Sequence, residues 1–367
     1  MKQATKLMRC SLFTTLLTSL LGSGIAFANT AVENYDKQNS HLGEYVYGVY
    51  GPEDAVEGGN LHIFEKEDAE FPGIAHAYGG YGETVYNNTV SMDGGTVYES
   101  LYGGYGTADV YQNKVVLTGG NTEKVAVYGG FGYRSFQNEV VLAGGKYDEV
   151  YGGYGTDEAF GNTVHLVGKG FAGSVSGVEV TGAASHIGQM TVDALKGRIT
   201  RSGTIDIYGT GITVGRLDEF DHLHFHMVNG QEKSDEAMIS IQMTPFYIRP
   251  KTEVTFDAVG AMDWKPGDSV TLVNAKSISV SQEYLEKEYD IYRYVDANDA
   301  KTLETAELLA TAHLELEQGG KVLKLVVDTT VPEPTSGTLS LLALAALAVL
   351  LLCSCLIDPY IFDKYDF

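Results

Sequence analysis

Ala77-Tyr-Gly-Gly-Tyr-Gly82 is the first of four near-identical segments that determine how this chain folds. The other three begin at Leu101, Val127 and Val150, so the motif recurs after 24, 26 and 23 residues. A recurring period of this length is typical of proteins built from stacked structural repeats. We therefore take each such stretch as one repeat unit of the fold.

The second half of each unit contains a short apolar segment that ends in glycine. The four segments are Asn88-Thr-Val-Ser-Met-Asp-Gly-Gly95, Asn113-Lys-Val-Val-Leu-Thr-Gly-Gly120, Asn138-Glu-Val-Val-Leu-Ala-Gly-Gly145 and Asn162-Thr-Val-His-Leu-Val-Gly-Lys-Gly170. Side chains alternate between the two faces of a strand. One face therefore carries the valines Val90, Val115, Val140 and Val164. The opposite face carries the polar residues Thr89, Lys114, Glu139 and Thr163, which predicts an apolar inner and a polar outer face.

Stacking the units in register places valine on valine and asparagine on asparagine, so that each strand finds parallel partners on both sides. The predicted fold is therefore all-β, with a parallel β-helix (solenoid) at its centre. We expect the glycine pairs to allow positive φ at tight corners. We also expect the motif tyrosines to form a stack of rings. The four asparagines are placed to form a ladder of side-chain amides at a turn. A disordered Gly- and Tyr-rich segment is the alternative, but disorder does not require valine and leucine at fixed offsets.

The start of the chain has the pattern of a secretory signal peptide at residues 1–28. Lys2, Lys6 and Arg9 precede an apolar run, and Ala26-Phe-Ala28 supplies the small residues that signal peptidase cleaves after. A retained membrane helix is the alternative, but the run is short and broken by Thr, Ser and Gly. The mature chain is therefore expected to be exported and to begin at Asn29.

The composition agrees with an exported β protein and excludes some functions. The chain has 367 residues, 44 of them glycine, and a formal net charge of −23. This acidity argues against nucleic acid as a partner, since phosphates would be repelled. The three cysteines, Cys10, Cys353 and Cys355, all lie near the chain ends. Residues 29–330 therefore cannot form a disulfide or a cysteine zinc site.

Changes in the repeat pattern and in the length of the predicted strands divide the exported part into four regions. A degenerate motif, Val46-Tyr-Gly-Val-Tyr-Gly51, indicates an N-terminal cap that shields the open edge of the array. A Gly-Gly pair at residues 319 and 320 predicts the turn of a late hairpin, and residues 303–312 are expected to form one short helix. The regions are the cap at 29–76, regular repeats at 77–170, irregular β-helix coils at 171–236 and a β-rich C-terminal segment at 237–330.

The end of the chain predicts attachment to a membrane. Val331-Pro-Glu-Pro-Thr335 is followed by an apolar stretch from Thr338 to Ile357, which has about the ~20 residues that span a bilayer as a helix. A buried soluble helix is the alternative, but the stretch has no polar face. Residues 331–357 are thus assigned to a Pro-Glu-Pro motif and a transmembrane helix, and residues 358–367 to a short acidic tail.

These motifs resemble two bacterial families. The Tyr-Gly-Gly-Tyr-Gly and Asn-x-Val-x-Leu-x-Gly-Gly units are similar to the repeats in passenger regions of autotransporter-like surface proteins. Pro332, Glu333 and Pro334, with the apolar stretch behind them, resemble the PEP-CTERM sorting signal. That resemblance implies an exosortase partner and the cell surface of a Gram-negative bacterium. The tail from Cys353 to Phe367 carries one Lys and three Asp in place of the signal's basic cluster, so processing at the motif stays open.

One histidine cluster has the spacing of a metal site. On a strand, His222, His224 and His226 share a face, and two histidines spaced in this way hold zinc when a third ligand joins them. Leu223, Phe225 and Met227 form an apolar alternate face, however, so the histidines are better explained as the solvent-facing side of an ordinary strand. We predict that this trio does not bind a metal tightly.

The remaining sequence predicts a binding or structural protein. No phosphate-binding loop follows the glycine motifs, the acidic residues of the repeats are scattered, and neither a catalytic residue nor a cofactor is expected. The predicted function is an exported, membrane-anchored surface β-solenoid with a structural or adhesive role, and extracellular glycans or host proteins are its expected partners. The alternative is a carbohydrate-active β-helix enzyme, a polysaccharide lyase or glycoside hydrolase. Such an enzyme requires carboxylates or basic groups that converge on one groove.

Overall fold

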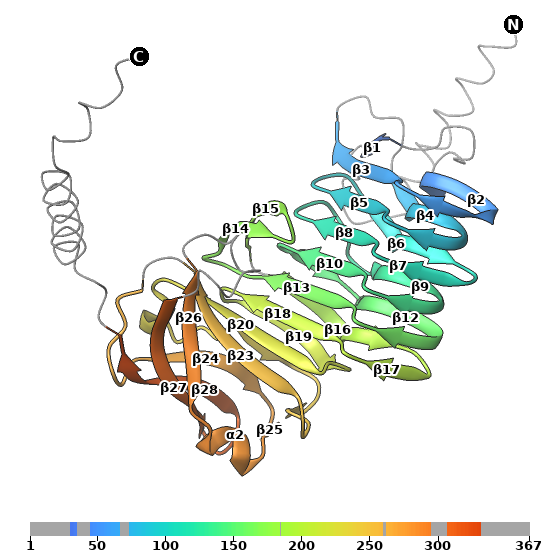
Figure 1. The fold of residues 1–367 in the computed structure, drawn as a ribbon. Helices are drawn as coiled ribbons and strands as arrows, with labels where there is room; N and C mark the ends of the chain where they lie inside the picture. Colours follow the sequence, from blue (N-terminus) through green and yellow to red (C-terminus); the bar gives the residue numbers. More distant parts are fainter. Residues whose placement is uncertain are drawn as a thin grey trace, which may run out of the picture.

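The computed structural model describes residues 30–34, 45–66, 73–183, 185–259, 262–294 and 307–331 (Figure 1). Strands dominate these residues, and the two helices among them are short: η1 (Gln231–Lys233) and α2 (Gln282–Glu286). Neither could cross a membrane, since both lack the length and the apolar character. The all-β prediction is confirmed. The predicted signal peptide, Pro-Glu-Pro motif, apolar stretch and acidic tail lie outside the described residues.

Most strands belong to one long mixed sheet, and Figure 1 shows them stacked in chain order along the molecule. The regular repeats supply β4 (Ile74–Tyr86), β5 (Thr89–Met92), β6 (Val97–Gly106), β7 (Asp109–Tyr111), β8 (Lys114–Leu117), β9 (Ala126–Phe136), β10 (Glu139–Leu142), β11 (Gly145–Tyr147), β12 (Glu149–Phe160) and β13 (Thr163–Val167). Each motif strand pairs in parallel with the motif strand of the next unit. The short Asn-x-Val strands pair in the same way.

The predicted register is confirmed for the four valines of the repeats. Val90 lies opposite Val115, Val115 opposite Val140, and Val140 opposite Val164. All four are fully buried in one hydrophobic core that continues to the end of the described chain. Burying a valine side chain contributes roughly 1.5–3 kcal/mol. The inner face of the repeats is thus a continuous apolar column.

The asparagine ladder forms as the sequence predicts. Asn113 donates from its backbone N and its Nδ2 to Asn138 Oδ1, both at 3.0 Å. Asn138 donates in the same way to Asn162 Oδ1, at 2.9 Å for both bonds. Asn88 extends the ladder, with Nδ2 2.9 Å from Asn113 Oδ1. The four residues are buried, so each amide satisfies polar groups of the neighbouring unit that water cannot reach.

Aromatic rings form parallel stacks along the units. The motif tyrosines stack at 4.8–5.1 Å between ring centroids: Tyr47, Tyr78, Tyr102, Tyr128 and Tyr151. A second stack, from the other motif aromatic, packs edge-on against the first: Tyr50, Tyr81, Tyr105, Phe131 and Tyr154. A third stack contains Tyr86, Tyr111, Phe136 and Phe160. Each stacked pair contributes about 0.5–1.5 kcal/mol beyond burial.

The glycines of the Tyr-Gly-Gly-Tyr-Gly motif have a different role from the predicted one. Positive φ occurs at the Gly-Gly pairs that end the short strands, such as Gly95 and Gly120, but not at the motif glycines, which lie in extended strands. A Cβ on Gly80 would lie 2.6 Å from Asn88 Nδ2. The motif glycines are therefore required by close approach, because the ladder asparagine packs against them.

The N-terminal region contains a degenerate unit with an extra edge strand. It contributes β1 (Thr30–Glu33), β2 (Tyr45–Glu57) and β3 (Asn60–Glu65). β2 and β3 pair in parallel with the first regular unit. β1 pairs antiparallel with β3 and occupies the edge of that strand. An antiparallel edge strand of this kind interrupts further parallel addition there.

After the regular repeats, the parallel stack continues with less regular strands. These are β16 (Ser185–Lys196), β17 (Ile199–Arg201), β18 (Thr204–Tyr208), β19 (Ile212–Asp218) and β20 (His222–Val228). The sequence predicts one short strand over Ser174–Val180, because glycines bound the segment. The structure instead has a hairpin of β14 (Ala172–Val175) and β15 (Val178–Thr181) there. Ser176 and Gly177 both have positive φ, the conformation of a tight two-residue hairpin turn.

Parallel pairing extends well beyond residue 236, after which the sequence predicts longer strands. The last elements are β21 (Ile239–Ile241), β22 (Phe246–Tyr247), β23 (Glu253–Val259), β24 (Ser269–Ala275), β25 (Ile278–Ser279), β26 (Tyr289–Tyr294), β27 (Glu307–Glu317) and β28 (Val322–Thr330). β20 pairs in parallel with β23, and β23 with β26. Only β27 and β28 then pair antiparallel, with each other and with β26 and β24.

The helix predicted over residues 303–312 is wrong where the structure describes it. Residues 307–312 belong to β27, which pairs with strands on both sides. Ala310, Ala312 and Leu314 are buried by this pairing, which outweighs the helix propensity of the Glu, Leu and Ala residues. The predicted hairpin is confirmed, with Gly319 and Gly320 at positive φ in its turn.

A buried histidine–aspartate cluster as candidate functional site

Strand β20 presents the three predicted histidines on one face. Leu223, Phe225 and Met227 are fully buried in the core, which confirms the predicted alternation. His222, His224 and His226 therefore lie on the opposite side of the strand. Their surroundings differ, because the strands on either side of β20 place different residues next to each histidine.

The neighbouring strands add two aspartates and a fourth histidine to this face. Register places Asp206 of β18 opposite His224, and Asp257 of β23 opposite His226. His165 of β13 lies opposite Asp206 on its other side. We call these five residues, His165, Asp206, His224, His226 and Asp257, the histidine–aspartate cluster.

Asp257 contacts both central histidines. His226 Nδ1 lies 2.7 Å from Asp257 Oδ1, at hydrogen-bond distance. His224 Nε2 lies 3.1 Å from Asp257 Oδ2. One carboxylate therefore faces one nitrogen of each ring, through a hydrogen bond to His226 and through an ion pair without hydrogen-bond geometry to His224. The other nitrogen of each ring is turned toward β18.

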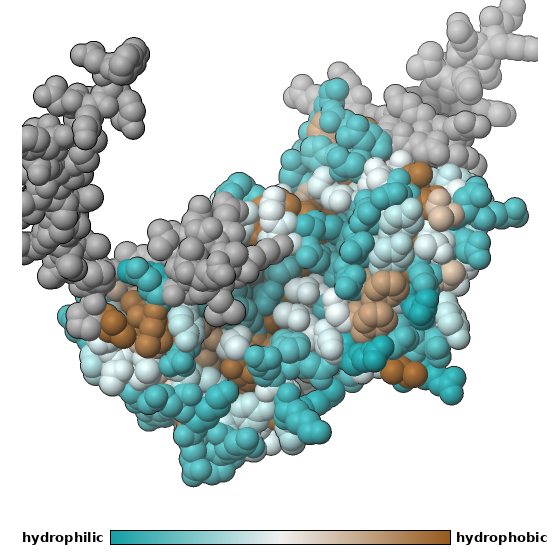
Figure 2. All heavy atoms as spheres, in the orientation of Figure 1, coloured by the Kyte–Doolittle hydropathy of each residue, from teal (hydrophilic) through white to brown (hydrophobic). Residues whose placement is uncertain are grey.

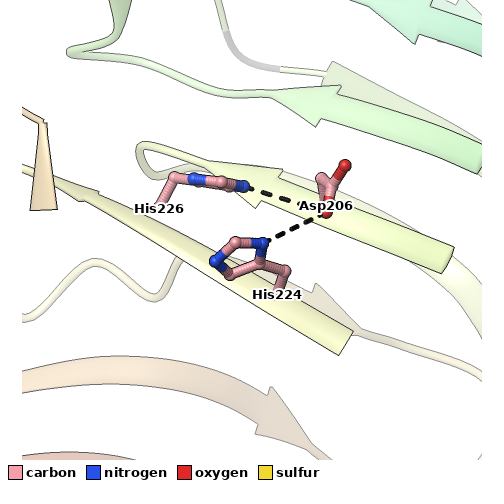
Figure 3. A group of neighbouring side chains, drawn as sticks. All are labelled: Asp206, His224 and His226. Atoms are coloured by element: carbon pink, nitrogen blue, oxygen red, sulfur yellow. Dashed lines mark ion pairs between the residues drawn. The ribbon is translucent and has the colours of Figure 1, made fainter. Parts of the chain in front are cut away.

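Asp206 faces those two remaining nitrogens, as Figure 3 shows. Its Oδ1 lies 3.6 Å from His224 Nδ1 and 3.8 Å from His226 Nε2. Both separations exceed a hydrogen bond. Its Oδ2 lies 2.9 Å from His165 Nδ1, but the orientation of that ring does not give hydrogen-bond geometry, so this attraction is mainly electrostatic.

The cluster is buried and strongly polarised. The side chains of His226 and Asp257 are 5% and 2% exposed, and that of His224 is 28% exposed. Burial alone would raise the pKa of both carboxyls, but the histidines hold the pKa of Asp206 well below its usual value and lower that of Asp257 to about 2. Burial alone would lower the pKa of His224, but the two carboxylates raise it to about 10. At neutral pH, protonated His224 therefore lies between two ionised aspartates.

Tyr208 fixes the orientation of His226. The two rings stack in parallel, with centroids 4.0 Å apart and planes inclined by 2°. Burial and the charges of Asp206 and Asp257 raise the pKa of Tyr208 well above its usual value, so the ring stays neutral. Held between Tyr208 and Asp257, the His226 imidazole has little rotational freedom.

His222, the first residue of the predicted trio, does not join the cluster. Its Nδ1 lies 3.0 Å from Glu253 Oε2, and its side chain is 45% exposed. The pair is a surface ion pair of a kind that contributes little to stability. The structure thus brings together two of the three predicted histidines and separates the third.

The hairpin β14–β15 covers the same outer face beside the cluster. Its apolar residues pack on outward-facing valines of the repeats in a second hydrophobic cluster that includes Val116, Val141 and Phe171. At its tip, Ser176 bonds with Glu139, and Lys114 Nζ lies 3.0 Å from Glu139 Oε2. Glu139 was expected on a freely varying polar face, whereas it joins the hairpin to the stack.

Sequence reasoning missed Asp206, Asp257 and His165 because each lies on a different strand from the trio. A signal was nonetheless present. In the short strands, the position of His165 is occupied by Ser91, Val116 and Val141 in earlier units. The next two strands have an ionisable residue at this position, first His165 and then Asp206. This change of residue type along one line of the outer face was visible in the sequence.

Asp193 is a third buried carboxylate, outside the histidine–aspartate cluster, and it lies at the end of the motif-tyrosine stack. It is opposite Tyr151 on one side and Asp218 on the other, and it is fully buried. Its nearest cations are distant, with Arg216 Nη2 at 3.8 Å and Lys196 Nζ at 3.9 Å. Burial raises the pKa of Asp193 to about 7, although Arg216 and Lys196 oppose the shift and Asp218 and Glu219 add to it.

We predict that Asp193→Asn flattens the dependence of stability on pH. The folded state binds the Asp193 proton more tightly than the unfolded state, whose pKa is near the ordinary 3.8. The wild-type free energy of unfolding therefore falls as pH rises from about 4 to about 7, by an amount on the order of 3 kcal/mol. Urea titrations at several pH values measure it. A variant whose stability loss over this range equals that of the wild type would contradict the assignment.

Comparisons of this chain with protein-family models, with curated protein sequences and with solved structures find no match. The resemblances carried by the repeats and by the Pro-Glu-Pro segment accordingly stay expectations from the sequence. The histidine–aspartate cluster is a group of ionisable side chains that the described residues bring together. Its role is inferred from its own geometry.

Proposed function

We propose that this chain is an exported bacterial surface protein in which a parallel β-helix acts as a structural or adhesive scaffold. The observation that carries the proposal is the repetition of one cross-section from unit to unit. Valine, asparagine and tyrosine each lie on their counterpart in the next unit. A stack of this kind makes a stiff, elongated body, since each unit contacts its neighbours through the same interface.

The outer surface suits exposure to solvent and contact with other molecules. Figure 2 shows hydrophilic side chains over most of the visible face, with apolar ones in scattered groups. With a net charge of −23, this surface favours cationic or neutral partners over nucleic acid. The stacked rings cover one another's faces, and Tyr47, Tyr78 and Tyr151 of the first stack are buried. Partners such as glycans or host proteins would therefore not meet open ring faces along these stacks.

The carbohydrate-active alternative is less well supported by the geometry. That reading requires carboxylates or basic groups open to a substrate. In the histidine–aspartate cluster the ionisable groups pair with one another, and Asp206 and Asp257 are buried. A second group of the described residues is also internally paired, since Arg249 forms ion pairs with Asp218 and Glu219. We therefore propose a non-enzymatic role.

A binding screen tests the scaffold role. The part of the mature chain without the membrane stretch, residues 29–330, is screened against arrays of glycans and extracellular host proteins, and the same glycans are monitored for cleavage products. We expect saturable binding to at least one class without product formation. Cleavage of a polysaccharide would instead favour the hypothesis of a carbohydrate-active enzyme.

We further propose that the chain is anchored in the membrane by the stretch from Thr338 to Ile357. The sequence supports this through its apolar length, since leucine favours insertion at the helix centre. We predict that the full-length chain fractionates with membranes and that truncation after Thr330 yields a soluble exported protein. Fractionation followed by immunoblotting measures both forms.

The mass of the membrane-bound chain distinguishes two modes of attachment. Cleavage by an exosortase near Pro334 would remove the residues that follow it, whereas a plain anchor would keep Phe367. Mass spectrometry of the C-terminus separates the two. A soluble full-length protein would contradict both forms of the proposal.

A further inference from the structure

The histidine–aspartate cluster contains three donor atoms arranged around one point. Asp206, His224 and His226 each offer one ligand atom, and these atoms lie within 4.8 Å of one another. Asp206 Oδ1 is 3.6 Å from His224 Nδ1 and 3.8 Å from His226 Nε2. Ligand atoms around a tetrahedral zinc ion, with bonds of about 2.0–2.1 Å, are separated by about 3.3 Å. Small side-chain rotations would close the site.

We propose that Asp206, His224 and His226 bind one divalent transition-metal ion, and that Zn²⁺ fits this donor set. Two imidazole nitrogens and one carboxylate oxygen suit zinc better than calcium or magnesium, which prefer oxygen ligands alone. Three protein ligands leave one tetrahedral position for water or another ligand. The set differs from the histidine trio of the sequence, which we predicted not to bind a metal tightly, because Asp206 takes the place of His222.

The second layer of contacts supports this assignment. Metal-binding histidines usually donate their other ring N–H to a carboxylate, which fixes the ring and makes the ligand nitrogen more basic. Asp257 does this for His226, whose Nδ1 lies 2.7 Å from its Oδ1, and its Oδ2 lies 3.1 Å from His224 Nε2 as an ion pair without hydrogen-bond geometry. His165 lies against the second oxygen of Asp206.

An unpartnered buried nitrogen is aimed into the site. His226 Nε2 has no hydrogen-bond partner among the described residues, although its side chain is 95% buried. Buried polar atoms in folded proteins nearly always have a partner. With Nδ1 bonded to Asp257 and the ring held by Tyr208, this nitrogen points toward Asp206 and His224, where a metal ion would satisfy it.

The site lies near solvent on one side and joins two strands. His224 is the most exposed of the three ligands, at 28% of its side chain, so its side of the site lies nearest to solvent. Asp206 lies on β18 and both histidines on β20, which are neighbouring strands in the parallel stack. A bound ion would therefore cross-link them and stabilise the folded state by RT ln(1 + [L]/Kd), where [L] is the free ion concentration.

Calorimetry on the purified chain, stripped with a chelator, tests the proposal. We expect Zn²⁺ to bind with a stoichiometry of one and to raise the melting temperature, and Ca²⁺ and Mg²⁺ to have neither effect. Asp206→Asn and His226→Gln should weaken Zn²⁺ binding at least 100-fold, and Asp257→Asn about 10–100-fold, since it removes only supporting contacts. His222→Gln is the matched control on the same strand and face, and it should leave the affinity unchanged.

A spectroscopic readout on the wild-type chain keeps the test independent of folding defects in variants. Long-range ¹H–¹⁵N correlation spectra report which ring nitrogen binds the metal. We expect zinc on Nε2 of His226 and on Nδ1 of His224, the two opposite nitrogens, because Asp257 holds the others. Absence of stoichiometric binding, metal on His222, or the reverse pair of nitrogens would overturn the proposal.

Discussion

Replacing Val140 by aspartate is expected to abolish the cooperative unfolding transition of the chain. Val140 is fully buried, between Val115 and Val164 in the inner column. The substitution removes roughly 1.5–3 kcal/mol of apolar burial and places a carboxyl group among valines with no partner, which costs several kcal/mol more. Since whole domains have only about 5–15 kcal/mol of stability, the folded array should not survive in its native form.

Urea denaturation followed by circular dichroism measures this effect. Thr163→Ser is the matched control, because Thr163 is a polar, partly exposed residue on a short strand of the same stack. Its transition should stay within about 0.5 kcal/mol of the wild type. Glu139→Gln, which the sequence suggests as an inert change, is unsuitable, since Glu139 contacts Lys114 and Ser176. Equal effects of the valine and threonine substitutions would refute the register.

Asn138→Ala is expected to destabilise the chain by about 3–6 kcal/mol. The Asn138 amide accepts two bonds from Asn113 and donates to Asn162 Oδ1 and to the Val110 carbonyl oxygen, and all of these groups are buried. Alanine removes these partners from the Asn113 backbone N–H and the Val110 carbonyl oxygen, and each such group costs about 1–3 kcal/mol. Asn113 Nδ2 and Asn162 Oδ1 each lose one bond but keep others. The penalty crosses three repeat units, because the ladder connects each unit to both of its neighbours.

Two further variants separate hydrogen bonding from simple loss of volume. Asn138→Asp keeps the acceptor oxygens but cannot donate, so it should destabilise the chain at neutral pH at least as much as alanine does. Asn121→Ala is the control, since Asn121 is an exposed asparagine in the preceding unit. An Asn138→Asp chain as stable as the wild type would show that the donated bonds do not matter.

The cross-section of the repeats was predictable because the information is local and repeated. The valine column, the asparagine ladder and the tyrosine stack each follow from one residue type at one offset in four units. The need for glycine at position 80 was not visible in the same way. It arises from Asn88, a residue of the same unit whose side chain packs over the Gly80 Cα only after the chain has turned.

The candidate site was only partly predictable, for a related reason. The spacing of His224 and His226 on one strand is visible in the sequence. Their partners Asp206 and Asp257 come from β18 and β23, the strands that flank β20 in the sheet. Those partners are set by the lengths of irregular loops, which carry no period after residue 170. The strand β27 was hard to predict for the same reason. Its antiparallel pairing depends on which strand edge is free to accept it, rather than on the residues of β27 itself.

The matching faces of successive units have a consequence for how such a chain changes over generations. Tyr78, Tyr102 and Tyr128 occupy one register position, so the face that each unit offers to the next is nearly the same. A recombination event that removes or duplicates residues 102–127 would join faces that already fit. Length can therefore change in steps of one unit without redesign of the interior, and selection can act on the reach of the protein separately from its stability.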